Sequence, residues 1–136
     1  MKYILQILVL FIFFYSDVHA NDYSRVETVK LKKDEHKKFL VQYGTVKKLF
    51  KFRWTLYAND GLVVLRSYDR IVAQNVLYLK LKNSTFKLDL KPKNGFTSPY
   101  LLVKFMEFDY TNNEAVFKLF LSDKNAQVTF QELEES

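Results

Sequence analysis

Residues 76–91 read VLYLKLKNSTFKLDLK, and this stretch decides the predicted fold. Leucine or phenylalanine occupies every second position on either side of Asn83-Ser84, and mostly polar side chains stand between them. Such alternation is typical of strands that bury one face. A two-residue turn at Asn83-Ser84 would set Leu79 against Leu88 and gather the apolar side chains on one face. We therefore predict an antiparallel hairpin here.

A second hairpin is predicted around residues 59–61, which read Asn-Asp-Gly. An Asp-Gly pair supplies the positive φ angles that a tight hairpin turn needs. The predicted register sets Ala58 against Val63 and Leu56 against Leu65 on the core face. The outer face would then carry Arg53, Thr55, Arg66 and Tyr68.

A third hairpin is predicted at residues 112–113, a pair of asparagines. Its register places Phe105 opposite Phe120 on the face away from the core. Continuing the chain into a further strand sets Leu119 against Phe130. The C-terminal part is thus expected to be a three-stranded meander.

The remaining sequence also favours strands, including residues 26–32 and 37–43. About eight or nine short strands joined by tight turns indicate an all-β fold. Either an antiparallel β-sandwich or an up-and-down β-barrel fits this pattern. We expect a single all-β domain over residues 21–136.

Residues 1–20 have the pattern of a secretory signal peptide. A lysine precedes an apolar run over residues 4–15, and small side chains at Val18 and Ala20 suit cleavage after Ala20. The run is shorter than the roughly 20 residues that a spanning helix needs. We expect a cleaved signal, with a retained membrane anchor as the alternative.

Composition suggests a location in the bacterial envelope, most simply the periplasm. The chain has no cysteine, whereas small secreted eukaryotic domains usually depend on disulfides. The formal net charge is +6, carried mainly by lysine. Such a charge favours another envelope protein or assembly as partner, or else anionic lipid or polysaccharide. The expected location in the envelope argues against nucleic acid as a partner.

Little in the sequence suggests catalysis. After signal cleavage the only histidine is His36, which stands among lysines and not beside an orienting acid. With no cysteine and one histidine, we expect no metal site and no cofactor. Asp69, next to Arg70, is the one acidic residue without an obvious structural role. We expect no enzyme, and a carboxylate-dependent hydrolase is the weakest alternative.

Two surface features remain as candidate contact sites. One is a basic face, and the other is an apolar strip on the outer side of the C-terminal strands. Together their residues are Lys47, Lys48, Lys51, Arg53, Tyr57, Arg66, Tyr68, Phe105 and Phe120. The leading hypothesis is a non-enzymatic module for protein interaction or assembly. The alternative is a carrier of a lipid or other apolar ligand in a barrel cavity.

Overall fold

The computed structural model describes residues 23–79, 83–92 and 98–134, and the predicted signal segment, residues 1–20, lies outside them. The described part contains nine strands and no helix, which confirms the predicted all-β, antiparallel class. Within it, no helix is long and apolar enough to cross a bilayer. The strands are β1 (Arg25–Lys32), β2 (Lys37–Tyr43), β3 (Val46–Ala58), β4 (Gly61–Tyr68), β5 (Ile71–Tyr78), β6 (Thr85–Asp89), β7 (Tyr100–Asp109), β8 (Glu114–Ser122) and β9 (Thr129–Leu133).

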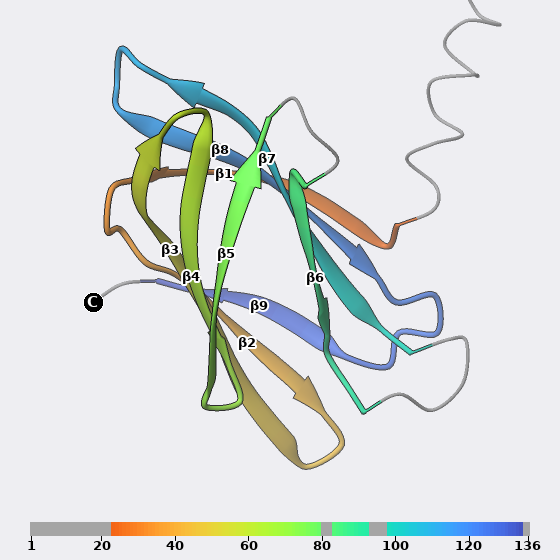
Figure 1. The fold of residues 1–136 in the computed structure, drawn as a ribbon. Helices are drawn as coiled ribbons and strands as arrows, with labels where there is room; N and C mark the ends of the chain where they lie inside the picture. Colours follow the sequence, from red (N-terminus) through yellow and green to blue (C-terminus); the bar gives the residue numbers. More distant parts are fainter. Residues whose placement is uncertain (1–22, 80–82, 93–97, 135–136) are drawn as a thin grey trace, which may run out of the picture.

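The strands form two antiparallel sheets (Figure 1). The four-stranded sheet has the order β1-β8-β7-β6, and the five-stranded sheet has the order β5-β4-β3-β2-β9. The chain changes sheet after β1, after β5 and after β8. An up-and-down barrel would instead pair neighbouring strands around one closed sheet. The first and last strands lie in different sheets, at the edges that face each other.

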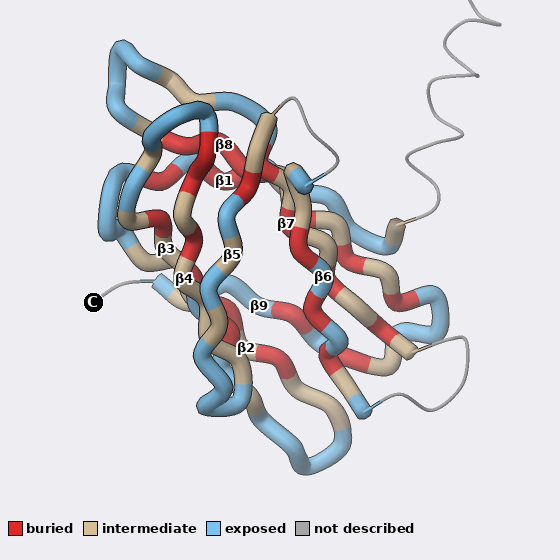
Figure 2. Tube along the Cα trace, viewed as in Figure 1, coloured by how far each residue is buried: buried red, intermediate tan, exposed pale blue. Residues whose placement is uncertain are grey.

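Buried residues occur along the strands of both sheets (Figure 2), and their side chains form one apolar core between the sheets. Phe50 and Phe52 of the five-stranded sheet and Phe117 of the four-stranded sheet are almost completely buried. The rings of Phe52 and Phe117 meet edge to face with centroids 5.3 Å apart. Each such side chain stabilises the fold by roughly 1.5–3 kcal/mol. The indole Nε1 of Trp54 also donates a hydrogen bond to the Leu31 carbonyl at 2.7 Å, which ties β3 to β1.

The hairpin predicted across residues 76–91 is wrong. β5 pairs with β4, where Leu77 lies opposite Leu62, and β6 pairs with β7, where Phe86 lies opposite Val103. The two strands therefore belong to different sheets. Alternation correctly showed that each strand has an apolar face, but both sheets need such a face. It could not show which strand lies beside which.

The hairpin between β3 and β4 is present, but its predicted register is wrong. The two turn residues are Asn59 and Asp60, with φ of 53° and 63°, so Ala58 pairs with Gly61. Asparagine adopts positive φ nearly as readily as glycine, which moves the turn one residue towards the N-terminus.

Moving the turn by one residue shifts the pairing by two residues, which leaves the faces of β4 unchanged. The bulge between Trp54 and Leu56 adds a single residue to β3, and it is this bulge that exchanges the two faces of β4 relative to the core residues of β3. Leu62 and Val64 are fully buried, whereas Val63, predicted to face the core, is only partly covered. A bulge after Trp54 also turns Leu56 to the outer face, where it is 53% exposed. The predicted core position of Leu56 is therefore wrong.

The hairpin between β7 and β8 turns across residues 110–113, but its predicted pairing is also wrong. A bulge that follows Phe105 shifts the register, so Phe105 lies opposite Phe117. Phe120 lies opposite Leu102. The bulge adds one residue to β7, which simple alternation cannot anticipate.

The predicted C-terminal meander is wrong as well. β9 pairs with β2, where Phe130 lies opposite Val41, and β8 pairs with β1, where Phe117 lies opposite Val29. The strands predicted over residues 26–32 and 37–43 are confirmed as β1 and β2. They lie in different sheets and do not pair with each other.

Candidate functional site

The predicted basic face is divided by the alternation of β3. Lys47, Lys51 and Arg53 lie on the outer face of the five-stranded sheet, and Lys48 lies on the inner face with Phe50. A pocket of about 210 Å³ opens on the outer face, lined by His36, Lys51, Phe52, Arg53, Leu65, Arg66, Ser67 and Val72. The structure thus brings Lys51 and Arg53 together, whereas Lys48 is separated from them by the sheet.

Lys48 takes part in a local contact at the end of the sheet. Its Nζ lies 3.2 Å from a carboxylate oxygen of Asp69 and 5.6 Å from the ring centroids of Tyr43 and Tyr68. The hydrogen bond with Tyr43 and the neighbouring Asp69 raise the pKa of Lys48. Asp69 itself stands in the two-residue turn between β4 and β5 with a φ of 52°. It therefore has a structural role that the sequence did not show.

Tyr57 and Phe105 both lie on the inner side. Phe105 is 1% exposed, so the predicted outer position of its side chain is wrong. Tyr57 stacks on Phe108 with ring centroids 4.3 Å apart. Its hydroxyl lies 3.4 Å from that of Tyr110, and this hydrogen bond together with burial raises the pKa of Tyr57 to about 12. Tyr57 and Phe108 thus extend the core, whereas Tyr110 is 74% exposed.

Phe120 does lie on an outer face, that of the four-stranded sheet. Val26 and Leu102 are its cross-strand neighbours, and Val26 is 43% exposed. In the next row along the strands, Lys104 lies directly opposite Lys118. The predicted apolar strip therefore exists around Phe120 but does not include Phe105.

Arg66 and Tyr68 were predicted on the outer face, and both lie on the inner one. The Tyr68 hydroxyl donates to the Leu90 carbonyl at 2.6 Å, and burial raises its pKa. The Arg66 guanidinium lies 4.6 Å from the ring centroid of Phe86, and its Nε donates to Asn75 Oδ1 at 2.7 Å. The reason is the bulge between Trp54 and Leu56, which sets Arg66 opposite Phe52 and Tyr68 opposite Phe50. Both side chains face β6 of the other sheet.

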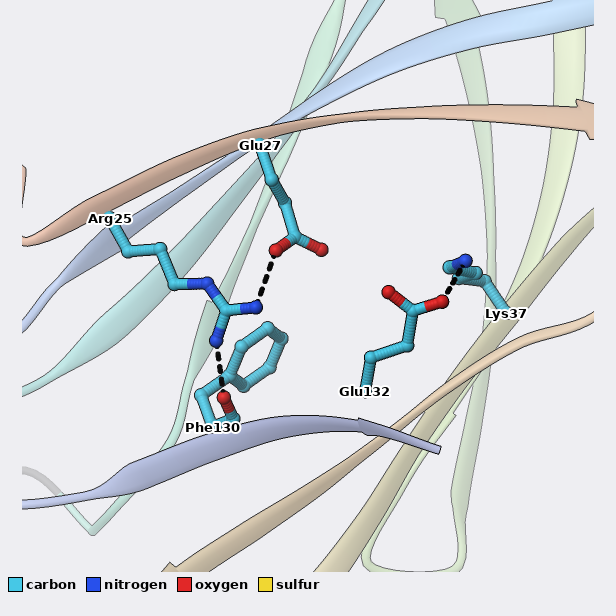
Figure 3. A network of polar contacts seen from close by, with 5 residues as sticks. All are labelled: Arg25, Glu27, Lys37, Phe130 and Glu132. Atoms are coloured by element: carbon cyan, nitrogen blue, oxygen red, sulfur yellow. Dashed lines mark hydrogen bonds and ion pairs between the residues drawn. The ribbon is translucent and has the colours of Figure 1, made fainter. Parts of the chain in front are cut away.

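The two sheets meet at two sides, and the β1–β9 side is closed by polar contacts (Figure 3). Arg25 of β1 donates to the Phe130 carbonyl of β9 and forms an ion pair with Glu27 at 2.6 Å. Beside it, Lys37 of β2 pairs with Glu132 of β9. A side chain from one sheet thus occupies a backbone acceptor at the edge of the other.

The β5–β6 side is different, because β5 exposes an apolar edge. Ile71 and Val72 are 72% and 73% exposed, and Val76 is 39% exposed. The strand Ile71–Tyr78 contains no charged residue and no proline. Proteins usually protect an edge strand with such residues. In the described part of the chain, no further strand pairs with β5 beyond β4.

The backbone direction along β5 follows from one hydrogen bond. Tyr78 donates its N–H away from β4, to the Asn83 carbonyl at 3.0 Å. In an antiparallel ladder the backbone groups of alternate residues point to the same side. Val72, Gln74 and Val76 therefore direct their N–H and C=O groups away from β4, towards the open edge.

A pocket of about 240 Å³ lies beside this edge, between β5 and β6. Ala73 and Ile71 of β5 form one wall, and Leu88 of β6 forms part of the other. The full lining is Phe50, Arg66, Ser67, Tyr68, Ile71, Ala73, Leu88 and Asp89. The small side chain of Ala73 leaves this space next to the edge unfilled.

Arg66 is the charged group on the inner wall of this pocket. In the part of the chain that the structure describes, no carboxylate lies within ion-pair distance of Arg66, although Asp89 lines the same pocket. Partial burial lowers the pKa of Arg66. A half-buried cation usually has an ionic partner. The pocket therefore combines apolar walls with an uncompensated positive charge.

The sequence analysis did not include β5 among the candidate contact sites. It assigned the strand from Val76 onwards to a hairpin with β6. A usable signal was present, because no charged residue occurs between Arg70 and Lys80. Among the described residues, no three His, Asp or Glu side chains are grouped so that they could hold a metal ion.

Comparisons with known proteins give no assignment. No family model matches the chain, no curated protein is significantly similar to it, and no solved structure matches its fold at a significant level.

Proposed function

We propose that the chain is a secreted, periplasmic β-sandwich that binds another envelope protein and catalyses no reaction. The contact is the open edge of β5, to which an extended segment of the partner adds as a further strand. The observation that carries this proposal is the exposed and uncharged strand Ile71–Tyr78, which, in the described part of the chain, pairs with no strand other than β4. We call this contact the β5 edge.

Strand addition suits the chemistry of the β5 edge. The partner's backbone would bond with the outward groups of Val72, Gln74 and Val76, which gives affinity independent of side chains. The exposed side chains of Ile71 and Val72 would be covered by the added strand. Their present exposure, on an edge without charges, is the arrangement that otherwise promotes unwanted association.

The proposed location in the envelope is supported by the signal pattern of residues 1–20, by the absence of cysteine and by the lysine-rich composition. The net charge of +6 favours an acidic partner. No specific observation favours the two alternative functions. Both pockets lie at the surface and hold at most about 240 Å³, and Asp69 already pairs with Lys48.

Variant-dependent co-purification tests the proposal. The tagged full chain and two variants are expressed in the source organism and purified from envelope extracts, and retained proteins are quantified by mass spectrometry. Gln74→Pro removes one outward N–H from the β5 edge without removing a bond to β4. The double variant Lys51→Gln/Arg53→Gln removes charge from the outer basic face instead.

We expect at least one envelope protein to be retained by the wild type and by the double variant, and to be lost with Gln74→Pro. Retention that is unchanged by Gln74→Pro would contradict the β5 edge as the contact. Loss with the double variant alone would place the contact on the basic face.

A further inference from the structure

The direction of the side chains along β5 determines where those of an added strand would lie. Ala73 and Leu77 face the core, whereas Val72 and Gln74 face outwards. Residues directly opposite each other in paired strands point to the same face. The partner residue opposite Ala73 would therefore enter the pocket of about 240 Å³ and lie beside Arg66.

Arg66 has donors available on that side of the pocket. Its Nε is used by Asn75, and its plane lies over the Phe86 ring, which holds the guanidinium in place. A guanidinium carries five N–H donors in a fixed fork, and a carboxylate is the acceptor that matches this fork with two bonds. The apolar walls around it would strengthen such a pair by excluding water.

We propose that the segment recognised by the β5 edge carries an acidic side chain opposite Ala73, and that this carboxylate pairs with Arg66. This inference rests on the proposed function and names the partner class: an extended peptide that combines β-forming residues with one Asp or Glu at an inward position. The backbone bonds supply affinity, and Arg66 supplies sequence preference.

A second copy of this chain does not fit the same position. Self-pairing through Ile71–Tyr78 would bring no carboxylate to Arg66, because that strand contains no Asp or Glu. It would instead place two uncompensated arginines near one interface. The charge of the pocket therefore favours a different, acidic segment.

Substitution of Asp89 should change the binding of an acidic peptide in the direction opposite to substitution of Arg66. Asp89 lines the pocket at the end of β6, where it is exposed, and it forms no ion pair with Arg66. An incoming carboxylate would be repelled by Asp89 and attracted by Arg66. Asp89→Asn should therefore strengthen binding of an acidic peptide, whereas Arg66→Met should weaken it.

The probes are fluorescein-labelled eight-residue peptides of alternating threonine and valine, in which a single Glu is moved through the positions. Each has a matched peptide with Gln at the same position. Binding to the purified chain is measured by fluorescence polarisation for the wild type, Arg66→Met, Arg66→Lys, Asp89→Asn and Gln74→Pro. Sedimentation velocity of the same samples gives the oligomeric state.

We expect one Glu peptide to bind about tenfold more tightly than its Gln counterpart. This ratio should fall to about one with Arg66→Met, recover only in part with Arg66→Lys, and rise with Asp89→Asn. Gln74→Pro should weaken the Glu and Gln peptides equally. If Arg66→Met does not fold, the wild-type ratio and its change in Asp89→Asn decide the question.

Equal binding of Glu and Gln peptides at every position, or no binding of either, overturns the carboxylate proposal and leaves the β5 edge itself to the co-purification test. A ratio that persists in Arg66→Met overturns the role of Arg66. A dimer in sedimentation that Gln74→Pro dissociates shows that a second copy occupies the edge, and it also overturns this inference.

Discussion

The β1–β9 side and the β5–β6 side of this protein differ in how the edges of the two sheets are covered. Each is a place where the edges of the two sheets meet. At the β1–β9 side, Arg25 reaches across to the Phe130 carbonyl and is itself paired with Glu27. At the β5–β6 side, Arg66 points between the sheets without an ionic partner in the described part of the chain. The first side is closed by polar contacts between the sheets, and the second has a pocket with a charged side chain on its inner wall.

In the proposed function, this difference is what gives an ordinary two-sheet fold a binding site. The five-stranded sheet ends in β9, which is short and carries an acidic residue paired with Lys37, and in β5, which is longer and uncharged. The same core supports both ends. We therefore expect partner binding at the unprotected edge of β5. The polar contacts at the protected edge of β9 are expected to contribute to the stability of the fold instead.

The largest expected effect comes from proline substitutions on neighbouring residues of β5. Ala73→Pro removes a backbone bond to β4 and should cost roughly 2–4 kcal/mol of unfolding free energy. Gln74→Pro removes an outward N–H and should cost less than about 1 kcal/mol. Urea unfolding of both variants measures the difference. Equal losses would show that the outward direction assigned to Gln74 is wrong.

The next effect concerns the connection from β8 to β9 on the closed side. The carboxylate of Asp123 is buried and accepts the N–H groups of Gln127 and Val128, each at 2.9 Å. Asp123→Ala leaves both donors without that acceptor and should cost roughly 2–3 kcal/mol. The exposed neighbour Lys124 gives a control, because Lys124→Ala should change stability by less than about 0.5 kcal/mol. Similar losses in the two variants would contradict this account of the loop.

A matched pair of arginine substitutions compares the two sides directly. Arg25→Met removes a bond between the sheets and leaves Glu27 without its ion partner, which should cost roughly 1–2 kcal/mol. Arg66→Met removes an uncompensated charge as well as two favourable contacts, so its cost should be less than half as large. Thermal and urea unfolding test the order. A larger loss at Arg66 would mean that its charge is already satisfied in the folded chain.

The smallest expected effect is a change in the pKa of Asp109, in the loop between β7 and β8. This loop lies away from both sides where the sheets meet, so it serves as a reference. The side-chain amide of Asn112 donates to Asp109 at 2.8 Å, and two backbone N–H groups add further bonds. These contacts hold the pKa of Asp109 below its ordinary value of 3.8. The stabilisation is therefore present above that value and is lost as the pH falls through the lower, folded-state pKa. In an NMR titration, Asn112→Ala should raise the pKa of Asp109, and an unchanged pKa would assign the shift to other groups.

Sequence alternation predicted the strands and most of their apolar faces, but of their partners only those in the β3–β4 and β7–β8 hairpins. β6 alternates and β5 has apolar residues on both faces, and neither pattern shows that the two strands belong to different sheets. The turn at Asn59 and Asp60 shifts the predicted pairing by two residues, and the single extra residue of the bulge after Trp54 then moves Arg66 from the outer face to the inner one. The bulges in β3 and β7 depend on packing against distant strands. Arg66 was thus found as a candidate by residue type, while its pocket could only come from the pairing of β4, β5 and β6.

Residue-resolved amide exchange tests the central claim most directly. In the chain alone, the N–H groups of Val72, Gln74 and Val76 should exchange rapidly, and those of Ala73 and Asn75 slowly, because only the latter bond to β4. With the tightest acidic peptide bound, the outward groups of Val72, Gln74 and Val76 should become protected, while the edge of β9 remains unchanged. Protection that appears elsewhere, or outward groups that are already slow in the chain alone, would contradict an open binding edge at β5.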